Sequence, residues 1–203
     1  MAHMEPLSKE DAMAAVPELK AAAEGMESKF GFVPNSIRTM ARRPEMVSGF
    51  MALQAGVMAP GDVPFELKKL VSHIASKAGG CVYCQAHSAY TSERAGIAAE
   101  RLDKLWEYQT SDLFTEAERA ALDYAVAAAS VPNQVTPEVH ARLSSHYDDG
   151  QIVEILGVIS LFGFLNRWNN SMATELEDPA AVYTSDLLGG RGWEVGKHGP
   201  EAT

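Results

Sequence analysis

Apolar residues recur at three- and four-residue spacing along almost the whole chain, and no segment alternates like a half-buried strand. The clearest helix covers residues 65–78, and Gly79 and Gly80 end it. A second helix is expected over residues 81–95. A long helix over residues 149–175 is apolar on nearly all sides, as in a helix at the centre of a fold or at a subunit interface. The sequence predicts an all-α protein.

The chain divides into three stretches. Residues 1–27 carry an N-terminal helix capped by Ser8, with residues 1–4 interpreted as a cloning remnant because a second Met follows a short spacer. Residues 28–180 form one helical domain, since no long polar linker interrupts them. Residues 181–203 lose the periodicity and gain glycine, which predicts a loop, a disordered end or an arm on a neighbouring subunit.

The net charge of −10 makes phosphate-rich partners unfavourable. Neither nucleic acid nor an anionic membrane surface is an expected partner, because both repel an acidic surface. No basic segment followed by an apolar stretch opens the chain. The longest apolar stretch, residues 155–165, is shorter than the roughly 20 residues of a membrane span. We therefore expect a cytoplasmic protein.

Only two cysteines occur, Cys81 and Cys84, and both fall in the first turn of the helix that follows Gly79 and Gly80. Unpaired backbone N–H groups and the helix dipole favour a thiolate at that position. Residues three apart share a helix side, so the sulfurs can form a disulfide. His87, three residues further on, adds an imidazole as base or proton shuttle. The spacing predicts a redox-active thiol site.

A peroxidase reaction is the natural chemistry of such a pair. One thiolate attacks a peroxide oxygen and becomes a sulfenic acid, which the second thiol converts to a disulfide. An external dithiol then restores both thiols, and no bound cofactor or metal is expected. We assign Cys84 as the attacking thiol because it lies one turn from His87, and Cys81 as the resolving thiol.

Two alternatives remain for the cysteines. They are half of a zinc site completed by His140 and His146, although these histidines are far along the chain, or they are a buried, inert pair. Haem attachment of the cytochrome c type would need His directly after the second cysteine, where Gln85 stands.

Four segments carry a resemblance to a known family: residues 30–35, 43–46, 76–87 and 164–170. With them the chain resembles the carboxymuconolactone decarboxylase-like, or AhpD-like, superfamily, and within it the peroxidase-related branch. The resemblance implies an AhpD-like all-α fold and assembly into a homo-oligomer, a trimer or hexamer. It also implies a thiol-dependent peroxidase-like site that takes a hydroperoxide or another small molecule and a thiol reductant.

The sequence departs from the family's proton relay. Well-understood members carry a glutamate at the position of Lys69 and a histidine at the position of Ser88. His87 lies one residue early, which rotates its side chain by about 100° around the helix.

A substitute relay follows from helical spacing. Glu66, Lys69 and His73 share one helix side, so the Lys69 ammonium would lower the pKa of Cys84 while His73 or Glu66 moved protons. The alternative is that Lys69 belongs to a solvated face. Polar residues after the apolar stretch are expected to hold neighbouring helices rather than line a pocket: Asn166, Arg167, Asn169 and Asn170.

Three functions follow from these observations. The first is a thiol-dependent hydroperoxidase or disulfide reductase. The second is a lyase, decarboxylase or isomerase of a small carbonyl or lactone compound, although decarboxylase members lack the cysteine pair. The third is a redox sensor or metal-binding module without turnover.

Overall fold

The computed structural model describes residues 2–200, and every regular element in that range is helical. The predicted all-α fold is therefore confirmed. The helices are α1 (Lys9–Ala15), α2 (Leu19–Phe30), α3 (Asn35–Met40), α4 (Pro44–Val57), α5 (Phe65–Ala78), α6 (Val82–Arg94), α7 (Ala99–Lys104), α8 (Glu116–Ala129), α9 (Pro137–Ser144), α10 (Asp149–Met172) and α11 (Asp178–Leu188), with short 3-10 helices η1 (Leu105–Glu107), η2 (Gly189–Arg191) and η3 (Gly196–His198).

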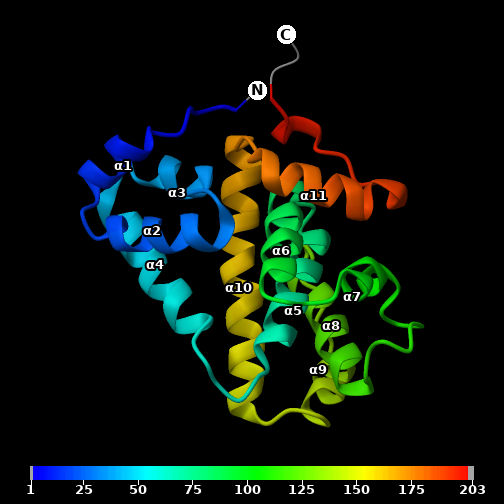
Figure 1. Ribbon diagram of the computed structural model, residues 1–203. Helices are drawn as coiled ribbons and strands as arrows, with labels where there is room; N and C mark the ends of the chain where they lie inside the picture. The colour runs from blue at the N-terminus through cyan, green and yellow to red at the C-terminus, as the bar shows by residue number, and fades with distance from the viewer. Residues whose placement is uncertain (1, 201–203) are drawn as a thin grey trace.

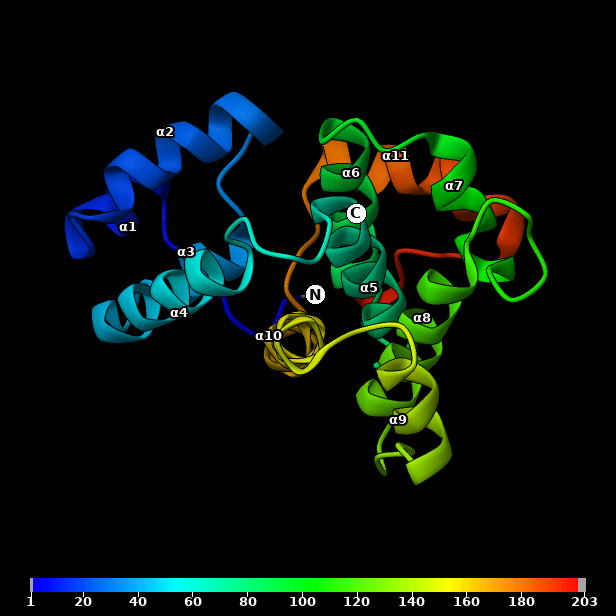
Figure 2. The same ribbon diagram turned by 90° about the horizontal axis from the view of Figure 1, so that it is seen from below.

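Helix α10 is the axis of the molecule (Figure 1). Viewed along this axis, α1–α4 lie on one side and α5–α9 on the other (Figure 2). A capping box starts the helix, with the Asp148 carboxylate accepting from the backbone N–H of Gln151 at 2.9 Å. By length and composition α10 could cross a membrane, and 33% of its most apolar window is buried. In this fold it packs against α4, α5, α6 and α8.

The two sides of α10 belong to different hydrophobic cores. Leu161 packs with buried residues of α1–α4, whereas Ile155, Val158 and Ile159 pack with α5 and α8. Val153 remains 70% exposed. The helix is thus central, as predicted, and its role at a subunit interface stays a prediction.

The α5–α6 junction has the geometry that its glycines and cysteine predict. Gly80 adopts φ +64°, a left-handed conformation that glycine tolerates without strain. The chain then turns so that Cys81 becomes the N-cap of α6, and its sulfur accepts a hydrogen bond from the backbone N–H of Cys84 at 3.3 Å. The predicted position of the cysteines in the first helical turn is confirmed.

The N-terminal helix is broken in two, contrary to the single helix expected within residues 1–27. Ser8 caps α1 as predicted, with its hydroxyl accepting from the backbone N–H of Asp11 at 3.0 Å. Val16 leaves the helical region (φ −132°, ψ 86°) because Pro17 follows it and disfavours an α conformation in the preceding residue. Within the segment interpreted as a cloning remnant, the His3 N–H donates to the carbonyl of Met172 at 2.8 Å, while Met1 lies outside the described residues.

The prediction of a loop or arm over residues 181–203 is wrong for residues 181–188, which belong to α11. Helix α11 packs against α6, and the following chain continues through η2 and η3. Trp193 is buried, and the backbone N–H of Leu176 donates to the carbonyl of His198 at 2.8 Å. The glycines that follow α11 made this part of the sequence look like a loop, although packing against α6 stabilises the helix. Residues 201–203 lie outside the described residues.

The close approach at Gly79 yields a stability prediction. A Cβ at Gly79 would lie 2.6 Å from the Asn166 amide nitrogen, which donates to the carbonyl of Ala75 at 3.3 Å. Gly79→Ala should therefore lower the free energy of unfolding in urea by about 1–3 kcal/mol. Gly49→Ala is the control, because nothing lies within 4 Å of that position inside α4. It should be neutral or stabilise by roughly 0.5–1 kcal/mol. Equal effects would contradict the prediction.

Candidate active site

A cavity of about 560 Å³ lies between α2–α4 on one side and α5, α6 and α10 on the other. Its wall is largely apolar, with Phe50, Phe162 and Leu165 among the lining residues. Polar groups interrupt that wall mainly on α5, α6 and α10: Lys69, Tyr83, Cys84, His87, Ser88, Thr91 and Asn169. An apolar cavity with a few convergent polar groups is the usual form of a small-molecule site.

The two cysteines take different positions at this cavity. Both are free thiols, and Cys84 lines the wall, whereas Cys81 is fully buried behind it. The side-chain amide of Asn169 donates to the Cys84 sulfur at 3.4 Å. Asn169 was expected to serve packing alone, as Asn166 and Asn170 do through bonds to the carbonyls of Ala75 and Gly80.

The acidities of the two thiols are opposed. A hydrogen bond from the Cys84 thiol lowers the pKa of Cys81, and the N–H of Cys84 adds to that effect. Burial raises the pKa of Cys84 well above its ordinary value. The expectation that the Lys69 ammonium lowers the pKa of Cys84 is therefore wrong. The thiol facing the cavity keeps its proton until a base removes it.

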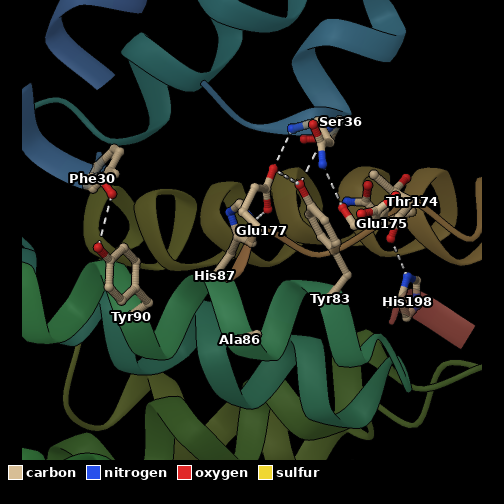
Figure 3. Close-up of polar contacts among 12 residues, drawn as sticks. Phe30, Ser36, Tyr83, Ala86, His87, Tyr90, Thr174, Glu175, Glu177 and His198 are labelled. Carbon is tan, nitrogen blue, oxygen red and sulfur yellow. Dashed lines mark hydrogen bonds and ion pairs between the residues drawn. The ribbon is translucent and has the colours of Figure 1, made fainter. Parts of the chain in front are cut away.

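A carboxylate from outside the predicted set joins the site. Glu177, just before α11, lies 2.5 Å from His87 Nε2 through Oε2. Its other oxygen, Oε1, accepts from the Tyr83 hydroxyl at 3.1 Å and from the backbone N–H of Asn35 at 2.5 Å. Figure 3 shows these side chains directed toward one another, with Ser36 beside them. The Tyr83 ring stacks on that of His87, with centroids 4.3 Å apart.

Glu177 is a buried anion. Burial alone would raise the pKa of its carboxyl, but the interaction with His87 and the backbone hydrogen bonds prevail and hold the pKa below its ordinary value. A carboxylate that fixes one imidazole nitrogen orients the ring and supports a positive charge on it.

The relay predicted from helical spacing is not assembled. Lys69 lines the cavity, and its ammonium donates to the Thr91 hydroxyl at 2.5 Å. Glu66 forms an ion pair with Arg101 and does not line the cavity. The three residues share a sequence spacing, but only Lys69 reaches the cavity.

His73 lies behind the cavity wall, where both ring nitrogens have partners. Nδ1 lies 2.9 Å from the Ser88 hydroxyl, which itself donates to the carbonyl of Gln85, and Nε2 accepts from the Trp106 indole at 3.2 Å. Burial lowers the pKa of His73 to about 4, so the ring is neutral at pH 7. His73 thus holds Ser88 in place and is not arranged to transfer protons to the thiols.

The zinc alternative finds no support in the described chain. Across residues 2–200, no three His, Cys, Asp or Glu side chains gather as a metal ion would require. His140 instead lies beside the Tyr124 ring, with centroids 6.2 Å apart.

Comparisons with known proteins define the family. The sequence model of the carboxymuconolactone decarboxylase family matches residues 44–127. The debrominase Bmp8 is 34% identical, with 90% of this chain and 96% of that chain covered and a TM-score of 0.83. It was solved in the apo form and, with a cysteine replaced by alanine, in complex with 2,3,4-tribromopyrrole. The chain belongs to the carboxymuconolactone decarboxylase family.

Two further proteins are similar to this chain. A protein of Escherichia coli K12 named uncharacterized protein YnjA is 30% identical over 147 residues, which cover 70% of this chain and 79% of YnjA. A peroxidase-related protein from Ralstonia eutropha JMP134 with an AhpD core is 23% identical. The structural match covers 83% of this chain and 90% of that chain, with a TM-score of 0.73. At 23% identity, the similarity to the Ralstonia protein establishes only the shared fold.

The opposed acidities can be tested by titrating each thiol alone. In a Cys84→Ser variant, the remaining Cys81 still accepts a hydrogen bond at the helix start. In a Cys81→Ser variant, Cys84 loses its neighbouring sulfur but stays buried. Thiolate absorbance in the ultraviolet should appear at lower pH for Cys81, by at least about one pH unit. Ionisation of Cys84 at a lower pH than Cys81 would contradict the opposed acidities.

Proposed function

We propose that this protein is a thiol-dependent oxidoreductase that reduces a small, largely apolar organic compound. The observation that best supports this proposal is the free thiol pair at the start of α6, with Cys84 in the wall of an apolar cavity and Cys81 directly behind it. Cys84 attacks the substrate, and Cys81 then forms the disulfide. An external dithiol reduces that disulfide.

In this proposal, His87 is the general base that deprotonates Cys84. Both residues line the cavity, and they lie one helical turn apart on α6. The imidazole accepts the thiol proton, and Glu177 stabilises the imidazolium that results. The Asn169 amide, which donates to the Cys84 sulfur, stabilises the thiolate. Glu177 and His87 thereby replace the family relay whose positions are occupied by Lys69 and Ser88.

Organic hydroperoxides are the first substrate class. The Cys84 thiolate attacks the terminal peroxide oxygen, the O–O bond breaks, and the departing alkoxide takes a proton to become the alcohol. Cys84 is then a sulfenic acid. The Cys81 sulfur displaces its hydroxyl as water and forms the disulfide, so two thiols are oxidised for each hydroperoxide reduced.

A second candidate is reductive dehalogenation of a halogenated aromatic compound. The likeness to the debrominase Bmp8, which extends over 90% of this chain, favours it. Here the aromatic carbon gains a proton while the Cys84 thiolate takes the halogen, which breaks the carbon–halogen bond. The Cys81 sulfur then displaces halide from Cys84 and forms the disulfide. Both candidates end in the same oxidised protein.

Thiol counting with product analysis tests the proposal. Reduced protein is mixed anaerobically with one equivalent of cumene hydroperoxide or of 2,3,4-tribromopyrrole. Consumption of two thiols for each product alcohol or bromide is expected, with repeated turnover once a dithiol is added. Cys84→Ser should abolish product formation, whereas Cys81→Ser should allow a single turnover that stops at modified Cys84.

Three results would contradict the proposal. Full activity of Cys84→Ser would exclude Cys84 as the attacking thiol. Conversion of a lactone or carbonyl compound with both thiols retained would establish the lyase or isomerase alternative. Oxidation of the pair without turnover in the presence of a dithiol would establish a redox sensor.

The role of Glu177 has a matched control in Glu66. Glu177→Gln removes the charge that supports protonated His87 and should lower the turnover rate by about 10–100-fold, in the range of general base catalysis. Glu66→Gln removes a carboxylate of the same size from an ion pair outside the cavity and should stay within about twofold. Stopped-flow decay of the thiol signal measures both. Equal effects would remove Glu177 from the mechanism.

A further inference from the structure

Lys69 and its neighbour Lys68 are both buried, but only Lys68 has a carboxylate partner. Lys68 is 2% exposed, lies 2.7 Å from Glu154 and donates to the carbonyl of Ala59 at 2.8 Å. Lys69 is 7% exposed and donates to the neutral Thr91 hydroxyl. Among the described residues no carboxylate lies within 4.0 Å of the Lys69 ammonium.

The Thr91 hydroxyl does not compensate the Lys69 charge. That hydroxyl donates its own proton to the carbonyl of His87 at 2.6 Å, so it accepts one hydrogen bond from the ammonium. An ammonium has three donors. A buried charge without an opposite charge is unfavourable unless a ligand supplies one.

The groups around Lys69 leave the cavity electropositive. On α5, His73 is neutral, and on α6, His87 is already paired with Glu177. From α2, Lys29 adds a second, exposed ammonium to the lining. The residues of α4 and α10 that line the cavity contribute neutral side chains such as Phe50, Gln54, Leu165 and Asn169. No lining residue carries a carboxylate.

We infer that Lys69 binds the anionic group of the substrate, which is therefore a small organic monoanion: an apolar body with one phenolate or carboxylate group. The apolar wall holds the body, Lys69 holds the charge, and the reacting atom is directed toward Cys84 in the same cavity. This assignment rests on the proposed function for the reaction, but the binding step it describes can be measured without turnover.

Burial lowers the pKa of Lys69 to about 8, which gives the binding a distinct pH dependence. A bound anion favours the ammonium over the amine, so binding should draw a proton onto Lys69 near that pH. Affinity for an anion should fall as the pH rises above about 8, because the unliganded amine then loses its charge.

Two ligands of nearly equal shape test the inference: 2,4,6-tribromophenol, which is ionised at neutral pH, and its uncharged methyl ether. Calorimetric titration into the Cys84→Ser variant measures both affinities without reaction. The phenolate should bind at least about tenfold more tightly at neutral pH. Adding Lys69→Met should remove that preference while changing ether binding by no more than about twofold. Lys29→Met is the matched control and should retain most of the preference.

Substitution by arginine separates charge from shape. Lys69→Arg keeps its charge across the titration, so its preference for the phenolate should persist above the pH at which the parent loses it. Thermal unfolding confirms that each variant is folded. An unchanged preference in Lys69→Met, or equal binding of both ligands by the parent, would overturn the inference. Failure of the proposed reaction would instead appear as thiols that stay reduced while the phenolate preference persists.

Discussion

A buried carboxylate joins three parts of the chain that are distant in sequence. Glu177 stands before α11, yet its oxygens contact His87 and Tyr83 on α6 and the backbone N–H of Asn35 at the start of α3. A buried anion is tolerated only where several donors surround it, so these contacts form together or not at all. The position of α3 over α6, and with it one wall of the cavity, depends on this charge.

The start of α6 imposes the second constraint. Gly79 allows close approach of Asn166, Gly80 reverses the chain, and Cys81 occupies the N-cap. Because Cys84 follows in the first turn, it reaches the cavity while Cys81 stays behind it. The same turn therefore determines both the burial and the opposed acidity of the two thiols.

Local signals made much of this fold predictable. Residues 65–78 form α5 as predicted, and Ser8 caps α1 as predicted. The contact between Glu177 and His87 was not predicted, for a physical reason: a glutamate directly before Asp178 and Pro179 has the appearance of ordinary charge at a helix start. Its partners are 90 and 142 residues away, and no local pattern records such pairings. Conversely, helical spacing placed Glu66 beside Lys69, but the Glu66 carboxylate forms an ion pair with Arg101 on α7 and does not face the cavity.

The complete burial of Cys81 has a kinetic consequence. Cys81 is fully shielded and Cys84 is 2% exposed, so the cavity is the approach to the disulfide as well as to the attacking sulfur. In the proposed reaction, the substrate and the reducing dithiol would then occupy the same space in turn. A cycle of that kind alternates between two half-reactions, with the first product leaving before the reductant enters. In the proposed reaction, excess substrate would therefore compete with the reductant for the oxidised protein.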